Sequence, residues 1–231
     1  MQILTGTSGF SYTAWRGAFY PEKLPEAQML GYYAERLTAV EINNTFYRMP
    51  TPEQLARWAA ETPAGFRFAL KSPRQITHIK KLADVADSVA RLSAAAGTLG
   101  ERLGPILFQL PPFLKKDLPR LEAFLATLPP SVKAAVEFRH ESWFTDDVYA
   151  ALKARDAALC VADSEDLATP FHATASWGYL RLRRQDYDDA ALAAWADRLR
   201  GQSLGDIYVF FKHEDEGRGA TLASAFAKLM R

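Results

Sequence analysis

The chain has 231 residues, of which 48% are hydrophobic and 24% are charged, which is the composition of a globular protein with a large core. Its 28 lysine and arginine residues balance 27 aspartate and glutamate residues, which argues against a protein that coats nucleic acid or anionic lipid. The single cysteine, Cys160, excludes an intrachain disulfide and a cysteine-rich zinc site.

No segment has the properties expected of a membrane span or a secretion signal. The apolar stretches fall short of the roughly 20 residues that cross a bilayer, and Met1 leads directly into a β-like run. We therefore expect a cytoplasmic protein that does not associate with membranes. No low-complexity linker interrupts the chain, so residues 1–231 are expected to form one domain.

Short β-like runs alternate with helical patterns along the chain. Strands are predicted over residues 2–6, 39–43, 66–71, 105–110, 133–139, 157–163, 178–183 and 206–212. Helices are predicted over residues 29–37, 52–60, 83–99, 118–128, 146–155, 189–199 and 222–229, with Thr51 and Thr145 as N-caps. Residues 163–176 have no clear helical pattern, so the sixth strand–helix unit is expected to be irregular.

Strands that alternate with helices predict parallel pairing, in either a closed α/β barrel or an open doubly wound sheet. A doubly wound sheet should place a glycine-rich phosphate turn between its first strand and first helix. Here Gly6-Thr7-Ser8-Gly9 lacks the third glycine and leads into Phe10-Ser11-Tyr12 rather than into a helix. The sequence therefore favours a closed parallel (β/α)8-like barrel.

Polar side chains gather where the predicted strands end. They are Glu41, Asn43, Lys71, Gln109, Glu137, Arg139, Asp163, Arg181, Arg183 and Lys212. The carboxyl ends of barrel strands share one face, where barrel enzymes carry their active sites. We favour a ligand site over the alternative of a structural plug, in which Glu41 and Lys71 form a buried ion pair.

Glu137 and Asp163 are expected on neighbouring strands, where two carboxylates could supply a general acid and base or bind a cation. Arg139 shares the side-chain parity of Glu137 and could neutralise it, so we assign no metal site. His78, His140, His172 and His213 lack metal-ligand spacing and are interpreted as loop or hydrogen-bonding residues.

Basic residues follow the last two predicted strands, where barrel enzymes often bind phosphate. They are Arg181, Arg183, Arg184, Lys212, His213 and Arg218. Glu214, Asp215 and Glu216 occupy the same loop and would repel an anion, so a solvated charged loop is the alternative.

Aromatic residues follow the first, second and fifth predicted strands. They are Phe10, Tyr12, Trp15, Phe19, Tyr20, Phe46, Tyr47, Trp143 and Phe144. They could stack on a sugar or a base, but we favour a hydrophobic lid over the barrel end.

Several linked motifs resemble the YecE-like family of domains of unknown function (DUF72) over nearly the whole chain. They include Gly6-Thr7-Ser8-Gly9-Phe10-Ser11-Tyr12, Val40-Glu41-Ile42-Asn43-Asn44-Thr45-Phe46-Tyr47-Arg48, Phe68-Ala69-Leu70-Lys71-Ser72-Pro73-Arg74, Phe108-Gln109-Leu110-Pro111-Pro112 and Glu137-Phe138-Arg139-His140. The resemblance implies a barrel of the triosephosphate-isomerase (TIM) type and a loose relation to sugar isomerases. The chain departs from the family at Phe211-Lys212-His213-Glu214-Asp215, where many members have an Asn- or Asp-rich turn.

We expect an enzyme, an isomerase, lyase or hydrolase, that acts on a small polar or anionic substrate such as a sugar phosphate or nucleotide fragment. The candidate catalytic residues are Glu41, Lys71, Glu137 and Asp163; the candidate substrate-binding residues are Asn43, Tyr47, Arg74, Gln109, Arg139, His140, Trp143, Arg181, Arg183 and Lys212. The alternative is a non-catalytic module that binds a nucleic-acid end or a protein, although near-zero net charge disfavours nucleic acid. The sequence assigns neither a cofactor nor an oligomeric state.

Overall fold

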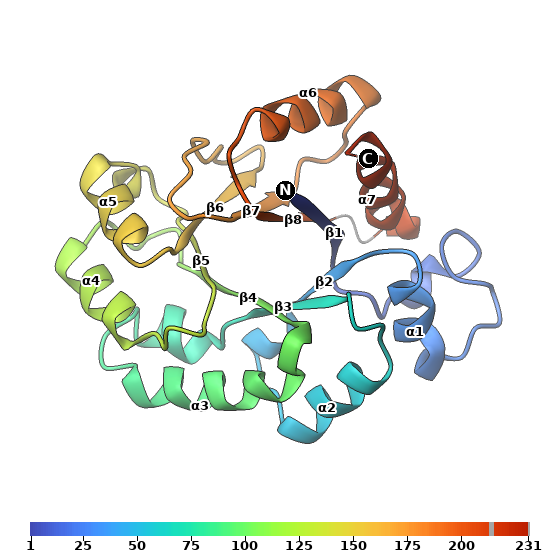
Figure 1. The fold of residues 1–231 in the computed structure, drawn as a ribbon, viewed down its shortest axis with the longest axis horizontal. Helices are drawn as coiled ribbons and strands as arrows, with labels where there is room; N and C mark the ends of the chain where they lie inside the picture. Colours follow the sequence, from blue (N-terminus) through green and yellow to red (C-terminus); the bar gives the residue numbers. More distant parts are fainter. Residues whose placement is uncertain (213–214, 231) are drawn as a thin grey trace.

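The computed structural model describes residues 1–212 and 215–230, and its strands form a closed parallel barrel (Figure 1). In this part of the chain the strands are β1 (Gln2–Ser8), β2 (Ala39–Ile42), β3 (Arg67–Lys71), β4 (Leu103–Gln109), β5 (Ala134–Glu137), β6 (Ala158–Asp163), β7 (Gly178–Leu182) and β8 (Asp206–Phe211). They pair in sequence order, and β1 also pairs with β8, which closes the barrel. The predicted barrel is confirmed, and the open sheet is excluded.

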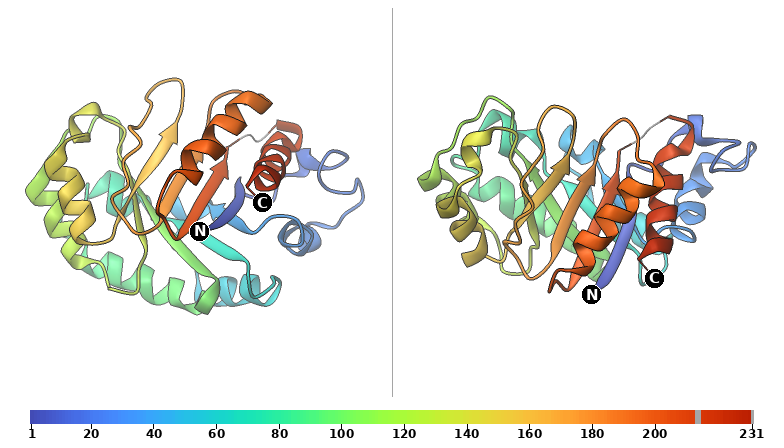
Figure 2. Two further views of the ribbon diagram at one scale, coloured as in Figure 1. Left: turned by 45° about the horizontal axis from the view of Figure 1, so that its top comes forward. Right: turned by 90° about the horizontal axis from the view of Figure 1, so that it is seen from above.

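The helices surround the barrel (Figures 1 and 2). They are α1 (Met29–Ala34), α2 (Pro52–Ala60), α3 (Ala86–Ala96), α4 (Leu118–Thr127), α5 (Asp146–Ala154), α6 (Asp189–Arg200) and α7 (Arg218–Leu229). The chain between β6 and β7 is described throughout and has no helix, which confirms the irregular sixth unit. Over the described ranges, no helix is both long enough and apolar enough to traverse a bilayer.

Short single-turn segments connect several of these elements. They are η1 (Thr13–Trp15), η2 (Glu26–Gln28), η3 (Asn44–Phe46), η4 (Gln75–Ile79), η5 (Gly97–Arg102), η6 (Glu141–Trp143) and η7 (Asp215–Gly217). Most are 3-10 turns, whereas η4 is a π-helical turn. Three of them, η3, η4 and η6, follow β2, β3 and β5 directly and so lie at the end of the barrel that carries the polar residues.

Local capping explains where the helices begin. The Thr51 hydroxyl accepts a hydrogen bond from the Gln54 N–H at 3.2 Å, and Pro52 occupies the first turn of α2, as predicted. The predicted cap at Thr145 is wrong in its chemistry, because that hydroxyl donates to Asp147 at 2.6 Å instead of accepting from the helix. Helix α7 begins at Arg218, four residues earlier than predicted, directly after the left-handed Gly217.

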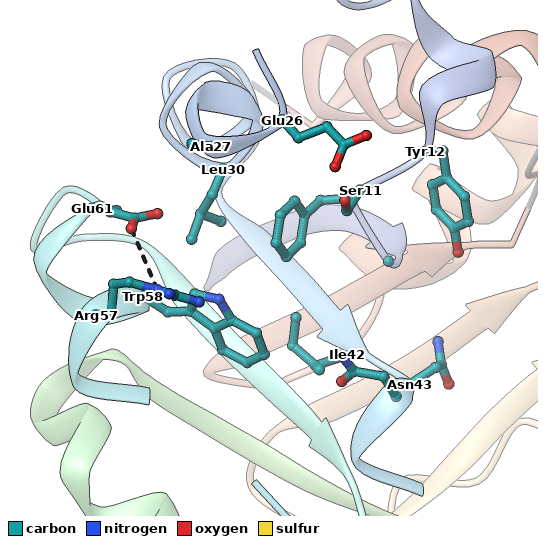
Figure 3. Close-up of a pocket in the computed structure, with 13 residues that line it drawn as sticks. Ser11, Tyr12, Glu26, Ala27, Leu30, Ile42, Asn43, Arg57, Trp58 and Glu61 are labelled. Carbon is teal, nitrogen blue, oxygen red and sulfur yellow. Dashed lines mark ion pairs between the residues drawn. The ribbon is translucent and has the colours of Figure 1, made fainter. Parts of the chain in front are cut away.

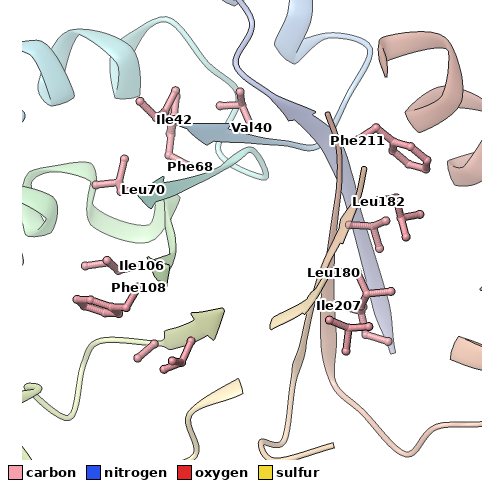
Figure 4. Packing of buried hydrophobic residues seen from close by; sticks show 14 of the residues in the cluster. Val40, Ile42, Phe68, Leu70, Ile106, Phe108, Leu180, Leu182, Ile207 and Phe211 are labelled. Carbon is pink, nitrogen blue, oxygen red and sulfur yellow. The ribbon is translucent and has the colours of Figure 1, made fainter. Parts of the chain in front are cut away.

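The main hydrophobic core lies between the strands and the helices. Alternate strand residues such as Val40, Leu70, Phe108, Leu180 and Phe211 point outward and pack under the helices (Figure 4). This packing fixes the side-chain parity of each strand. The other set of residues must therefore face the barrel axis.

The barrel interior is filled by side chains of very different size. Strands β2, β3, β5 and β6 contribute alanines, namely Ala39, Ala69, Ala135 and Ala158, whereas β7 and β8 contribute Tyr179, Tyr208 and Phe210. The rings of Tyr179 and Phe210 lie 5.3 Å apart. Large and small residues together close the lower barrel and form the floor of the polar layer above it.

Gly6 of β1 lies directly against the backbone of the neighbouring strand β2. A Cβ atom at Gly6 would lie 1.8 Å from the carbonyl oxygen of Ala39, which belongs to the backbone of β2 and cannot rotate away. We predict that Gly6→Ala lowers the free energy of unfolding by about 3 kcal/mol in urea denaturation, because two paired strands must separate.

Gly97→Ala is the matched control. Gly97 has helical backbone angles, and a Cβ atom there has no neighbour within 4 Å. This variant should change the unfolding free energy by no more than about 1 kcal/mol, in the stabilising direction. Equal stability of Gly6→Ala and the parent protein would contradict the close approach.

Candidate functional site

Arg181 occupies the centre of the polar layer, at the carboxyl end of β7. Its side chain is 2% exposed and lies between two carboxylates from strands across the barrel. One terminal nitrogen lies 2.8 Å from Glu41 Oε1 on β2, and the other lies 2.7 Å from Glu137 Oε2 on β5. We call these three residues the Arg181 clamp. The clamp links three separate strands through charge-assisted hydrogen bonds.

Further hydrogen bonds hold the Glu41 side of the clamp. Glu41 Oε1 accepts from the Ser8 hydroxyl at 2.7 Å and from the Asn43 amide at 3.2 Å. Glu41 Oε2 accepts from the Tyr179 hydroxyl at 2.7 Å. Burial by itself raises the pKa of Glu41, but the Arg181 charge and these hydrogen bonds outweigh it, so the pKa is lowered.

The Glu137 side is held in the same way. Glu137 Oε1 accepts from the Gln109 amide at 2.8 Å and lies 3.6 Å from an Arg183 nitrogen. Burial raises the pKa of Glu137, yet the charges of Arg181 and Arg183 outweigh it and the net shift is downward. Both clamp carboxylates are therefore ionised at neutral pH, and their oxygens are already occupied by donors.

Lys71 does not pair with Glu41, so the predicted ion pair is wrong. Arg181 reaches across the barrel and binds Glu41, the carboxylate that the order of the strands placed next to Lys71. The Lys71 amine lies instead 4.3 Å from the centre of the Phe46 ring, and no carboxylate of the described chain lies within ion-pair distance of it. Burial and the Arg181 charge lower the pKa of Lys71 to about 8, and the two clamp carboxylates offset this only in part.

Asp163 faces away from the barrel axis, so the expected approach of Asp163 to Glu137 is wrong. Asp163 shares the outward parity of Val161 and points toward α6. It accepts hydrogen bonds from Arg184 at 2.8 Å, from Tyr187 at 3.0 Å and from Trp195 at 3.2 Å. Over the described residues, no three His, Cys, Asp or Glu side chains are grouped so that they could hold a metal ion.

A cavity of about 490 Å³ opens beside the clamp, at the ends of β5, β6 and β7. Its inner wall includes Glu137, Arg139 and Arg183, and its outer rim includes the exposed Glu141 and Asp166. Arg183 is 20% exposed, and its buried Nε donates no hydrogen bond to any described residue. Burial, followed by the charges of Arg181 and Arg139, lowers the pKa of Arg183. The inner wall thus has donors that are not fully used.

The basic residues predicted to form a phosphate site after β7 and β8 are not brought together. Arg181 is consumed by the clamp, and Arg184 pairs with Asp163 on the opposite side of the strand at 2.8 Å. Arg218 pairs with Asp186 at 2.6 Å. Lys212 is exposed, and His213 and Glu214 lie outside the described residues. Among the described members of this set, only Arg183 lines the cavity beside the clamp.

The remaining predicted binding residues have varied positions. Asn43 and Gln109 donate hydrogen bonds to the clamp carboxylates. His140 lines the cavity, and its Nδ1 accepts a hydrogen bond from the Ser142 N–H at 3.2 Å. Trp143 is fully buried, stacks on Phe138 at 4.6 Å and donates to the Leu114 carbonyl, which is a structural role. Tyr47 and Arg74 are exposed on the loops after β2 and β3.

Some residues near the clamp were not among the predicted site residues, although the alternation of side chains along their strands places them there. Ser8, Cys160 and Tyr179 face the axis at alternate positions of their strands. Burial raises the pKa of the Cys160 thiol, whose sulfur lies 4.0 Å from Glu137 Oε2, so it stays protonated beside the clamp. The Phe46 ring contacts the Lys71 amine. The centre of the same ring lies 4.8 Å from the centre of the His78 ring.

A second cavity of about 520 Å³ lies outside the barrel rim, between the β1 loop and α2 (Figure 3). Phe10, Leu30, Ile42 and Trp58 line it, with an Arg57–Glu61 ion pair of 3.8 Å on its rim. Asn43 also lines it. The neighbouring Trp15 and Tyr20 are fully buried. The aromatic segment after β1 therefore packs into the outer hydrophobic core, and a lid over the barrel end stays a prediction.

The fold and this charged layer define a TIM-type α/β barrel with a polar site at the carboxyl ends of its strands. The chain belongs to the family described as "Protein of unknown function DUF72", whose model matches residues 4–231.

The chain is similar to two curated relatives over part of their length. It is 37% identical over 113 residues to the UPF0759 protein YecE of Escherichia coli, which covers 48% of this chain and 42% of the relative. It is 26% identical over 147 residues to the UPF0759 protein YunF of Bacillus subtilis, which covers 59% of this chain and 52% of the relative. The matches thus span about half the length of these relatives.

Solved structures resemble the whole chain. A DUF72 family protein of Thermotoga maritima has a TM-score of 0.88 at 28% identity and covers 100% of this chain and 99% of its own. A DUF72 family protein of Enterococcus faecalis has a TM-score of 0.81 at 18% identity. The match covers 99% of this chain and 95% of that protein, and it supports the fold alone.

Breaking the clamp should reverse the pH dependence of stability. With Arg181 present, the lowered pKa values of Glu41 and Glu137 add stability above the ordinary value of 4.5, and that stability is lost as the pH falls below it. We predict that Arg181→Met costs about 3–5 kcal/mol at neutral pH, because Glu41 loses its counter-ion and Glu137 keeps only Arg183 at 3.6 Å.

In that variant burial raises the pKa of Glu41, which has no other cation beside it, so the loss should shrink as the pH is lowered from neutral toward 4.5. Urea denaturation across this range measures it. Lys133→Met, which breaks the exposed Lys133–Asp206 pair at 3.3 Å, is the control and should cost less than about 1 kcal/mol. A loss in Arg181→Met that does not change with pH would refute the assignment.

Proposed function

We propose that the protein is an enzyme that acts on a small anionic substrate, such as a sugar phosphate or nucleotide fragment, at the mouth of the barrel. In this proposal Arg183 and Arg139 bind the anionic group, Lys71 transfers a proton, and the Arg181 clamp holds the strand ends in place. A cytoplasmic location belongs to the same proposal.

The observation that carries the proposal is an excess of positive charge above the clamp. Glu41 and Glu137 are taken up by Arg181, which leaves Lys71 and Arg139 with no described carboxylate within ion-pair distance and Arg183 with only a 3.6 Å contact to Glu137. Their repulsion is evident in the lowered pKa values of Lys71 and Arg183, for which burial is the largest cause and neighbouring cations add to it. A bound anion would relieve this repulsion and accept the unused guanidinium donors.

The same geometry divides the roles of the candidate catalytic residues. Glu41 and Glu137 are positioning residues here, because they are ionised and fully occupied by donors. Asp163 supports the outer face of β6 and β7. Lys71 is the remaining candidate that changes protonation near neutral pH, as a general base should. Proton transfer of this kind suits an isomerase or lyase, and a hydrolase if the base activates water.

Two features favour the enzyme over a nucleic-acid-binding module. The aromatic residues after β1 are packed against one another, as in the T-shaped contact of Trp15 with Phe19 at 5.7 Å, and do not form a free stacking surface. The outer rim of the mouth carries Glu141 and Asp166, which would repel a phosphate backbone.

Anion binding is tested by thermal unfolding with inorganic phosphate and with a panel of sugar phosphates. A ligand at about 100 times its dissociation constant should stabilise the protein by roughly 2.7 kcal/mol. We predict a stabilisation that saturates with concentration and is lost in Arg183→Ala, because this variant removes the guanidinium of the inner cavity wall.

Arg184→Ala is the matched control. It removes an adjacent arginine that points to the opposite side of the strand and pairs with Asp163. This variant should lower the melting temperature by itself but keep the phosphate-induced shift. Absence of any anion-induced shift in the parent protein, or an equal loss in both variants, would reject the proposed site. A salt-sensitive shift with short oligonucleotides alone would favour the binding module.

A further inference from the structure

Lys71 stands in an unusual position for a lysine close to two glutamates. It ends β3 on the axis side of the barrel, and its side chain is half-buried. Both nearby carboxylates are held by Arg181, at 2.8 Å and 2.7 Å. The amine faces the Phe46 ring, which favours an ammonium ion only weakly and accepts no strong hydrogen bond.

Burial is the largest cause that disfavours the protonated form of Lys71, and neighbouring charges act in both directions. Arg181 and Arg183 repel the ammonium, while Glu41 and Glu137 attract it from within the clamp. His78, on the loop after β3, has a lowered pKa. Burial is the largest cause, and the charges of Lys71, Arg74 and Arg139 add to it. His78 is thus neutral near Lys71 and adds no positive charge of its own.

We propose that Lys71 is an amine nucleophile that forms a Schiff base with an aldehyde or ketone substrate bearing an anionic group. The proposal rests on the proposed anion site for its substrate class but not for the reactivity of the amine. An amine that is largely buried, has no carboxylate within ion-pair distance and lies near other cations is in the kind of environment that activates lysines for this chemistry.

The reaction needs no oxidant or reductant. The neutral amine donates its lone pair to the carbonyl carbon, a C–N bond forms, the C=O π bond opens, and one nitrogen proton passes to the oxygen to give a carbinolamine. The second nitrogen proton then passes to the hydroxyl group, the C–O bond breaks and water leaves, so that a C=N bond replaces the C=O bond. Hydrolysis reverses these steps and restores Lys71. The linked substrate can lose a proton from the adjacent carbon, which is the step that isomerases and lyases of this type need.

The test uses the full chain and pyridoxal phosphate, an aldehyde with an anionic group, followed by reduction with borohydride and peptide mapping. At about pH 8 Lys71 should have roughly 100-fold more neutral amine than an ordinary lysine, since each pKa unit is a factor of ten. Its lower basicity makes it a weaker nucleophile, so we expect labelling at Lys71 at least about tenfold above any other lysine. Labelling should fall when inorganic phosphate is present.

Two comparisons make the test specific. Lys116→Arg removes a lysine that pairs with Asp147 at 2.6 Å and should leave labelling of Lys71 unchanged, whereas Lys71→Arg should abolish the dominant labelled peptide. Pyridoxal without phosphate separates the two proposals. Preferential labelling of Lys71 by both aldehydes, with no protection by phosphate, would support the nucleophile and reject the anion site.

Labelling spread evenly over the exposed lysines would overturn the Lys71 proposal. If phosphate still stabilised the protein in that case, the anion site would stand and Lys71 would not be the nucleophile. If labelling at Lys71 did not rise as the pH passed through about 8, the proposal would fail as well, because the amine would not have the predicted acidity.

Discussion

A single buried charge governs the polar end of this barrel. The guanidinium of Arg181 lies on the axis, away from water, where an unpaired charge would be very costly. It is tolerated because Glu41 and Glu137 neutralise it at hydrogen-bonding distance and are themselves held by Ser8, Tyr179 and Gln109. A buried pair of this kind adds little net stability over a hydrophobic replacement. What it fixes is the relative position of the strands that provide its members.

The chemistry available at the mouth follows from how the clamp distributes charge. Because the two carboxylates serve Arg181, Lys71 and the cavity-lining Arg183 are left with only partial compensation. The same arrangement makes the acids of the site poor proton carriers and makes its lysine a good one. Structural and chemical roles are thus separated within one layer of side chains: the clamp holds the geometry, and the residues around it face the cavity.

Much of this architecture could be predicted from the chain, because alternating apolar patterns and helix-start residues are local signals. The barrel, the irregular sixth unit and the face that carries the polar residues all followed from such signals. The side-chain partners did not. Glu41 and Arg181 are 140 positions apart, and no local pattern shows that an arginine crosses the axis to displace Lys71. The outward position of Asp163, in contrast, was predictable from the sequence. Alternate residues of its strand, Leu159 and Val161, face outward, and Asp163 continues that series.

The order in which the clamp residues occur in the chain has a consequence for synthesis. Glu41 and Glu137 leave the ribosome well before Arg181, so a nascent chain that ends before β7 contains two acids whose counter-ion does not yet exist. Burying them at that stage would be unfavourable, and they remain hydrated. Premature collapse of the first six strands into a closed core is therefore opposed by the same residues that later join the barrel. The last quarter of the chain supplies the charge that allows closure.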